Sequence, residues 1–237
     1  MNFGIEFLFD TKMKNTIPAV KRTSEMMHKS ALDSIVPAHH KGRKAKVQIP
    51  VNCYSEDAAR RLYEFLKISL ADVDNWGDFK PGISFHPKLI NRNGQTVTGI
   101  AKPGDLIKIL LPRWQAAGRL FDWREITRIE ERLHGNTEIF FITIVPAVNP
   151  ELEAPEASHF LRAESTVTFF VIRDGNKLQL EVHTRNEGLN FQLSGFRTRL
   201  QIVMMGVFIA GGFYESQWTK LLKSILKYGM SQMKFSN

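Results

Sequence analysis

The sequence is poor in cysteine and in long apolar runs, and each absence excludes a class of protein. Cys53 is the only cysteine among 237 residues, so no disulfide can form within the chain, and a reducing compartment such as the cytoplasm is the simpler location. The longest apolar run, Ile202–Tyr214, has 13 residues, whereas a membrane-spanning helix needs about 20. The first residues also lack the basic head and cleavage site of a secretory signal. We therefore expect a globular protein of the cytoplasm.

The net charge of +8 is concentrated at the two ends of the chain. Residues 1–46 carry nine Lys and Arg against four Asp and Glu, residues 213–237 carry four against one, and residues 47–212 hold nineteen of each sign. A nucleic-acid-binding domain more usually concentrates its basic residues on its folded face. Solvated ends that keep the protein soluble are the first interpretation. The alternative is that these ends dock on an anionic membrane surface or, less favoured, on nucleic acid.

No motif for catalysis or for metal binding stands out. The seven histidines form no His-x-His or His-Glu-x-x-His array, and a single cysteine adds little to a zinc site. Gly206–Gly212 is not a phosphate loop, because no Gly-Lys-Ser/Thr follows it. His183 falls on the polar side of a predicted strand and is expected to be solvated. The sequence therefore gives no catalytic residue, no metal ligand and no cofactor.

The order of the periodic segments predicts an α+β fold. Residues 47–51 alternate as a first strand, and Ser55–Ser69 has a good N-cap, an acidic first turn and apolar residues at helical spacing. Gly135 and Gly175, each followed by Asn, predict two tight hairpins. Six further strands are predicted at Ile83–Ile90, Asp105–Leu111, Arg124–Leu133, Glu138–Val145, Ser165–Arg173 and Lys177–Arg185.

The last long segment, about Thr198–Tyr228, has helical spacing. Its first half is apolar on nearly all sides and its second half is amphipathic, as expected for a helix laid across a sheet. The predicted architecture is thus a curved antiparallel sheet of about seven strands wrapped around a long C-terminal helix. We divide the chain into a basic, partly structured N-terminal extension at 1–45, a ligand-binding domain at 46–230 and a tail at 231–237.

This layout resembles the START-like superfamily, which includes polyketide cyclases and lipid-transfer domains. The segment Lys102–Ile109 is similar to the Gly-Asp opening of the third strand in many bacterial members, and Phe121–Thr127 is similar to the start of the next strand. The resemblance covers about Lys46–Tyr228. It implies a helix-grip fold, in which the sheet and the C-terminal helix enclose a cavity for an apolar ligand.

The aromatic residues suggest what fills the interior. Both faces of Glu138–Val145 are apolar, so one face can line a pocket while the N-terminal extension or a second subunit covers the other. A solid core is the alternative, since aromatic residues fill cores as readily as they line cavities. The predicted ligand-binding residues are Trp123, Phe141, Arg162, Phe169, Leu180, Met205, Phe208 and Phe213.

We therefore expect the protein to carry or sense a hydrophobic small molecule such as a lipid or a polyketide, without chemistry. Arg162, Glu164 and His159 are the first polar anchors to consider, because they end the long connection Pro146–Phe160. The alternative is an aromatase or cyclase in which Arg162 or Glu164 moves protons. A second alternative is a peripheral membrane or nucleic-acid interaction protein that acts through its basic ends.

Overall fold

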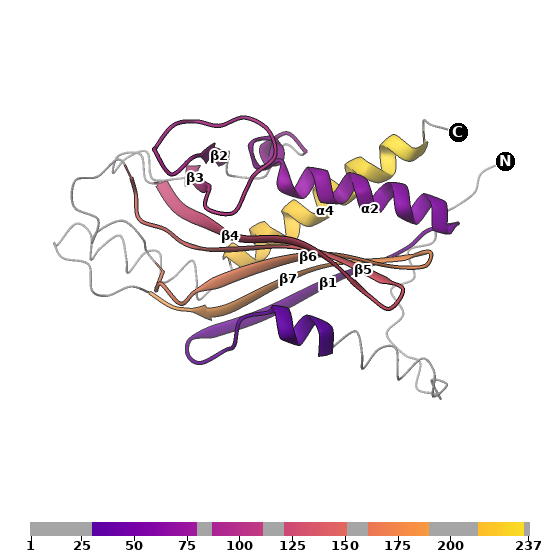
Figure 1. Ribbon diagram of the computed structural model, residues 1–237, viewed down its shortest axis with the longest axis horizontal. Coiled ribbons are helices and arrows are strands. Elements are labelled where there is room, and N and C mark those ends of the chain that lie inside the picture. The colour runs from indigo at the N-terminus through magenta and orange to yellow at the C-terminus, as the bar shows by residue number, and fades with distance from the viewer. Residues whose placement is uncertain (1–29, 80–86, 111–120, 151–160, 190–212, 235–237) are drawn as a thin grey trace. The chain divides into compact units, whose positions relative to one another are not determined.

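The computed structural model describes residues 30–79, 87–110, 121–150, 161–189 and 213–234, and its centre is a seven-stranded antiparallel sheet (Figure 1). Across the sheet the order is β1-β7-β6-β5-β4-β3-β2, so β2 to β7 form a meander and β1 pairs with β7. The strands are β1 (Arg43–Asn52), β2 (Pro87–Ile90), β3 (Leu106–Leu110), β4 (Phe121–His134), β5 (Thr137–Pro146), β6 (Thr166–Asp174) and β7 (Lys177–Glu187).

The chain divides into two compact units, residues 1–35 and 36–237. Of the first unit the structure describes residues 30–35, which are helical, with the Ser34 hydroxyl donating to the Ala31 carbonyl oxygen at 2.7 Å. The second unit contains the sheet and every labelled helix. The predicted division of the chain after residues 45 and 230 stays a prediction.

The helices form where local chemistry predicts them. In α2 (Glu56–Ala71), the Ser55 side chain accepts a hydrogen bond from the Ala58 N–H, and Glu56 and Asp57 lie at the positive end of the helix dipole. The short 3-10 helix η1 (Val73–Gly77) follows directly. The last helix is α4 (Phe213–Lys234), and the first part of the predicted C-terminal helix, residues 198–212, lies outside the described residues.

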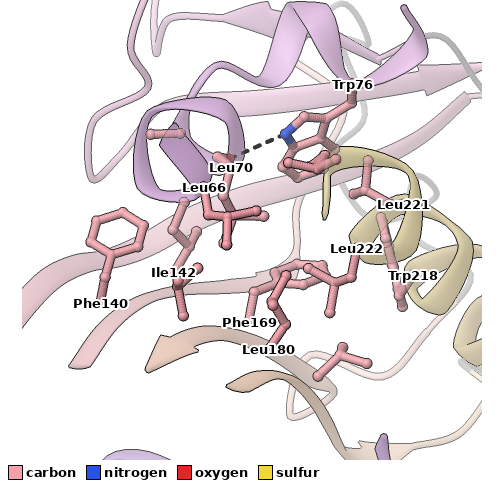
Figure 2. Packing of buried hydrophobic residues seen from close by; sticks show 14 of the residues in the cluster. Leu66, Leu70, Trp76, Phe140, Ile142, Phe169, Leu180, Trp218, Leu221 and Leu222 are labelled. Carbon is pink, nitrogen blue, oxygen red and sulfur yellow. Dashed lines mark hydrogen bonds between the residues drawn. The ribbon is translucent and has the colours of Figure 1, made fainter. Parts of the chain in front are cut away.

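Both long helices pack against one face of the sheet, which we call the inner face (Figure 1). Alternate residues of the strands point toward the helices, so the inner face is largely apolar (Figure 2). Members of this core include Leu66 and Leu70 of α2, Ile142 and Phe169 of the sheet, and Trp218, Leu221 and Leu222 of α4. The predicted α+β helix-grip fold is thus confirmed.

The 3-10 helix contributes one of the largest buried side chains, Trp76. Its ring meets Phe169 edge-on at 5.9 Å and Trp218 edge-on at 6.2 Å, while its indole N–H donates to the Leu70 carbonyl oxygen at 3.1 Å (Figure 2). Trp76 therefore joins α2, the sheet and α4 at one point. The sequence predicts a loop at Asp72–Gly82, yet this part of the segment belongs to the core.

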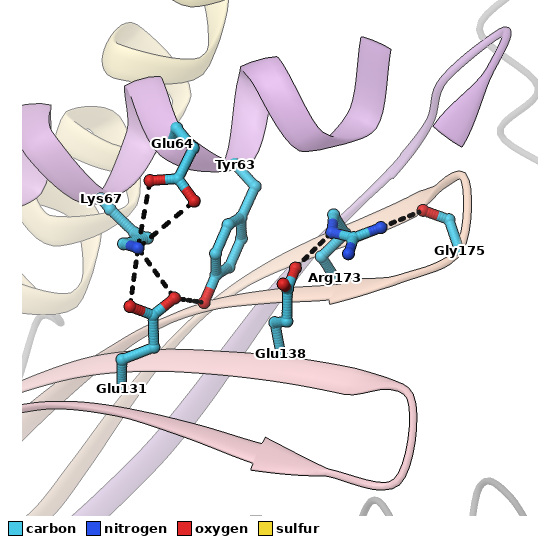
Figure 3. A network of polar contacts seen from close by, with 7 residues as sticks. All are labelled: Tyr63, Glu64, Lys67, Glu131, Glu138, Arg173 and Gly175. Carbon is cyan, nitrogen blue, oxygen red and sulfur yellow. Dashed lines mark hydrogen bonds and ion pairs between the residues drawn. The ribbon is translucent and has the colours of Figure 1, made fainter. Parts of the chain in front are cut away.

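A polar network fixes α2 to β4 (Figure 3). The Tyr63 hydroxyl donates to Glu131 at 2.9 Å, and the Lys67 ammonium lies 2.7 Å from the same carboxylate. Burial, reinforced by Glu131, raises the pKa of Tyr63 above its usual value. A bulge in β4 between Ile126 and Arg128 shifts the alternation of the strand, which places Glu131 on the inner face, where it can reach α2.

Candidate functional site

Two oppositely charged side chains lie buried on the apolar inner face. Asp122 and Arg124 belong to β4, and their side chains are each 1% exposed. Both Nε and Nη2 of Arg124 lie 2.8 Å from Asp122 Oδ2. Because side chains alternate along a strand, residues 122 and 124 share the face of Ile126, which packs in the core against the helices. The ion pair thus points into the interior.

A second carboxyl group reaches the inner face through a bulge in β7. Asn186 has a left-handed backbone with φ of 56°, and the register with β1 shifts between Arg43 and Ala45. Arg43 shares the inner face with Val47 by alternation, and Glu187 is its partner across the strands. Residues paired across a ladder lie on the same face, so the bulge turns Glu187 inward.

Glu187 is a buried carboxyl group, and its environment favours the protonated form more than water does. The residue is 5% exposed, and burial raises the pKa of its carboxyl group, although the charges of Arg124 and Arg43 act in the opposite direction. Glu187 Oε1 accepts no hydrogen bond from the part of the chain that the structure describes. This carboxyl group can therefore donate to or accept from a molecule placed beside it.

The first turns of α4 complete the polar group of residues. Glu215 pairs with Arg43 at 2.6 Å, and the charges of both act on Glu187. We call this group the polar end of the interior; it consists of Arg43, Asp122, Arg124, Glu187 and Glu215.

The arrangement suits recognition of one polar group next to a large apolar area. Ligand pockets in proteins are mostly apolar and carry a few convergent polar groups that fix orientation. Arg124 supplies N–H donors and Glu187 supplies a carboxyl group, while the rest of the inner face supplies aliphatic and aromatic side chains. In the described part of the chain, no group of three His, Cys, Asp or Glu side chains is placed to hold a metal ion.

The structure brings some of the predicted site residues together and separates others. Phe169 and Leu180 both lie in the core of the inner face. Trp123 and Phe141 lie on the opposite face, because they alternate with inner-face residues of their strands. Phe141 there contacts Phe170 at 5.8 Å between ring centroids. The expectation that all the predicted residues share one pocket therefore needs correction for Trp123 and Phe141.

The remaining predicted residues lie at or beyond the ends of the described segments. Arg162 is half-buried in the segment that precedes β6, and it lines a surface pocket together with Glu164. Met205 and Phe208 lie outside the described residues, and so does His159. Phe213 begins α4, and its side chain is likewise outside the description. Ligand binding by Arg162, Met205, Phe208 and Phe213 stays a prediction.

The residues that make up the polar end were not found from the sequence. The Arg and Glu residues interleaved from Arg124 to Arg132 predict ion pairs on a wet face, so this pattern does not distinguish Arg124 from its neighbours. The available signal was the spacing of Asp122 and Arg124 on either side of Trp123, since it places both charges on the face of Ile126. No pattern in the sequence predicts the bulge that turns Glu187 toward the inner face.

His183 is buried, so the expectation that it is solvated is wrong. On the face opposite the helices, its Nε2 lies 2.5 Å from Glu181 Oε2, and Phe170 packs edge-on against its ring at 5.2 Å. Glu181 also accepts from Gln48 at 2.5 Å and lies 3.2 Å from the Lys46 ammonium. Burial alone would raise the pKa of Glu181, but these partners together lower it to about 2.

We expect this carboxylate to make stability depend on pH in the acid range. A carboxyl group whose pKa is lowered in the folded state contributes stability at pH values above its ordinary pKa of 4.5. This contribution disappears as the pH falls toward the folded-state pKa of about 2. The Glu181→Gln variant should be less stable by about 1.5–3 kcal/mol near neutral pH and should approach the parent protein near pH 2. Urea unfolding at a series of pH values tests this, and parallel curves for the two proteins would contradict it.

Comparisons with known proteins give matches at the level of structure. No family model matches the chain, and no curated protein matches it. A START superfamily protein from Mycobacterium smegmatis is 9% identical, with a TM-score of 0.35, covering 79% of this chain and 99% of the other. Major latex-like protein 151 from Panax ginseng is 11% identical, with a TM-score of 0.37 and the same two coverages. Ara h 8.0201 is 13% identical, with a TM-score of 0.38, covering 80% of this chain and 99% of the other.

A START superfamily protein is among these structural matches. The fold itself is established by the strand order and by the packing of α2 and α4 on the inner face. Within the described ranges, no helix combines the length and the hydropathy needed to cross a membrane.

Proposed function

We propose that the protein binds a hydrophobic small molecule that carries one polar group, such as a fatty acid, another lipid or a polyketide. The ligand lies along the inner face beside α4, and its polar group meets Arg124 and Glu187. One observation carries the proposal: the charged side chains of Asp122, Arg124 and Glu187 are buried together at the polar end of a largely apolar face.

The energetic argument starts from the cost of buried charge. Moving an ion pair out of water costs several kcal/mol per ion, and well-packed apolar residues often serve stability equally well or better. A solid core therefore gains little from Asp122 and Arg124, and it gains nothing from the inward turn of Glu187. A binding site gains specificity, because a ligand without a matching polar group leaves Glu187 Oε1 buried with no hydrogen bond from the described residues.

The two kinds of surface predict the chemistry of the ligand. Its apolar part would be held by burial against side chains such as Phe169 and Leu180, at about 25 cal/mol per Å². Its polar part would be a carboxylate, carbonyl or hydroxyl group, since Arg124 donates hydrogen bonds and a protonated Glu187 also donates. A carboxylate suits the guanidinium group best.

The test is binding by the purified protein, with a matched pair of variants. Native mass spectrometry should find a bound small molecule, or a fluorescent fatty acid should bind and be displaced by the natural ligand. Glu187→Leu should weaken that binding about tenfold, because leucine can neither donate to nor accept from the polar group of the ligand. Glu131→Leu is the control; it makes the same change on the inner face beside Lys67, outside the polar end, and should leave binding unchanged.

Two results would contradict the proposal. One is the absence of any bound molecule together with no binding across a panel of fatty acids, sterols and polyketides. The other is equal loss of binding in both variants, which would mean that Glu187 has no special role.

The enzyme alternative is favoured by one observation, the burial of the Glu187 carboxyl group at 5% exposure on the inner face, which raises its pKa. General acid–base catalysis works best with groups that titrate near the working pH, and burial is the usual way to shift a carboxyl group in that direction. In this alternative Glu187 takes the proton-transfer role, rather than Arg162 or Glu164. Turnover of a bound polyketide by the parent protein but not by Glu187→Gln would establish it.

Other expectations keep their status as predictions. The single Cys53, half-buried and with its pKa raised by burial, is compatible with a cytoplasmic location. The further predictions are that the protein carries or senses its ligand, forms a homodimer, and docks on an anionic membrane through its basic ends. Nucleic acid remains the less favoured partner.

A further inference from the structure

A surface pocket separate from the polar end gathers charge that is not neutralised. Its volume is about 330 Å³, near the lower limit for small-molecule sites. The pocket lies where the chain enters β1, leaves β7 and begins β6, and its lining residues are His40, Lys41, Arg162, Glu164 and Asn186.

One wall of the pocket is fixed by Asn186. Its side-chain oxygen accepts from the backbone N–H groups of His40 at 2.7 Å and of Lys41 at 3.2 Å, and its amide nitrogen donates to the Ala38 carbonyl oxygen at 2.9 Å. Gly42, which follows Lys41, has φ of +92°. A Cβ at this position would come within 2.3 Å of the Glu187 carbonyl oxygen, so only glycine fits there. The segment that carries His40 and Lys41 is thus held in place before any ligand arrives.

The opposite wall is fixed through the backbone beside β7. The Arg162 N–H donates to the Gly188 carbonyl oxygen at 2.9 Å, and its Nε donates to the Leu189 carbonyl oxygen at 3.3 Å. The guanidinium group lies directly on Gly188, where a Cβ would be 3.0 Å from the guanidinium carbon. Arg162 is therefore held through its backbone N–H and its Nε, while its terminal Nη groups donate no hydrogen bond to the described residues and can reach a ligand.

The charges of the pocket are unpaired. Within the described residues, no carboxylate lies within the 4.0 Å ion-pair distance of Lys41 or Arg162, and Glu164 likewise forms no ion pair there. Two cations facing one concave surface attract an anion. Arg and Lys together are the residues that proteins use for phosphate, with Arg providing directed donors and Lys a point charge.

We infer that this pocket binds the phosphate group of a small phosphate ester, held by Lys41 and Arg162. The carboxylate of Glu164 repels the phosphate group but accepts hydrogen bonds from a hydroxyl or ammonium group. The pocket therefore suits a ligand that carries such a group beside its phosphate. Such a ligand is either a soluble phosphorylated metabolite or the headgroup of a phospholipid. The inference does not depend on the proposed hydrophobic ligand.

Isothermal titration calorimetry with O-phosphoethanolamine tests the soluble source, and sedimentation with phosphatidylcholine vesicles, with and without phosphatidylethanolamine, tests the lipid source. Lys41→Gln and Arg162→Gln should each weaken binding at least about tenfold, since each removes a charged hydrogen bond. Lys41 is exposed, so its variant will fold even if the Arg162 variant does not. Lys220→Gln, an equal change of charge on exposed α4 surface, should have no effect.

Each outcome decides the inference. Binding in either arm that both pocket variants weaken and Lys220→Gln spares supports it and identifies the source. No binding in either arm, or binding that Lys41→Gln and Lys220→Gln affect equally, overturns it. Inorganic phosphate should bind more tightly than acetate, and equal binding would overturn the choice of phosphate. Glu164→Gln should abolish any preference for phosphoethanolamine over inorganic phosphate, and a preserved preference would overturn the role given to Glu164.

Discussion

Replacing Arg124 by methionine should destabilise the protein by about 3–5 kcal/mol, the cost of leaving one member of a buried ion pair alone. Asp122 would then be buried at 1% exposure without the guanidinium group that now contacts it through two nitrogens. A carboxylate at this depth has lost most of its contact with water, so the loss of its charged partner costs free energy. Urea unfolding of the parent and the variant measures the difference.

The control is the double variant Asp122→Val/Arg124→Met, in which both charges are removed. It should recover much of the lost stability, because apolar replacement of a whole buried pair is often neutral or stabilising. If the double variant folds, it should still lack the ligand contact assigned to Arg124. A single variant within about 1 kcal/mol of the parent protein, or a double variant no better than the single one, would contradict this account of the polar end.

Replacing Trp76 by alanine should also cost about 3–5 kcal/mol, as for other large buried aromatic residues. The indole ring is completely buried and contacts Phe169 and Trp218, so its removal leaves a cavity where the sheet, α4 and η1 meet. The hydrogen bond from its N–H to the Leu70 carbonyl oxygen at the end of α2 is lost as well. Thermal and urea unfolding of the variant measure the loss.

Trp76→Phe separates the packing from the hydrogen bond. Phenylalanine keeps most of the aromatic contact but cannot donate to Leu70, so the expected cost is about 1–3 kcal/mol. Similar stability of the alanine and phenylalanine variants would mean that the ring contributes little beyond its N–H group. That result would contradict the assignment of Trp76 to the core.

Local sequence signals predict much of the fold, because a few neighbouring residues determine each hairpin turn, each strand face and the start of α2. Gly135 and Gly175 take positive φ values of 61° and 58° in the two tight turns, where glycine has no Cβ to clash. Strand alternation correctly places Phe169 and Leu180 in the core. Helix α2 begins after its predicted cap, Ser55.

The site was harder to predict, because it depends on irregularities and on tertiary burial. The bulge at Asn186 reverses the alternation of β7, so simple counting places Glu187 on the wrong face. Trp76 lies among loop-forming residues, yet it is buried by elements distant in sequence. His183 reads as a surface residue because its strand alternates cleanly, and its burial depends on the environment of the face opposite the helices.

The pairing of β1 with β7 has a consequence for folding during synthesis on the ribosome. The meander of β2 to β7 can assemble progressively as the chain leaves the ribosome, since each strand pairs with the one made just before it. The first strand of the unit has no partner until the last one is synthesised, and the helix that covers both arrives later still. During that interval β1 presents an unpaired edge, so this strand is where a chaperone would bind the nascent chain.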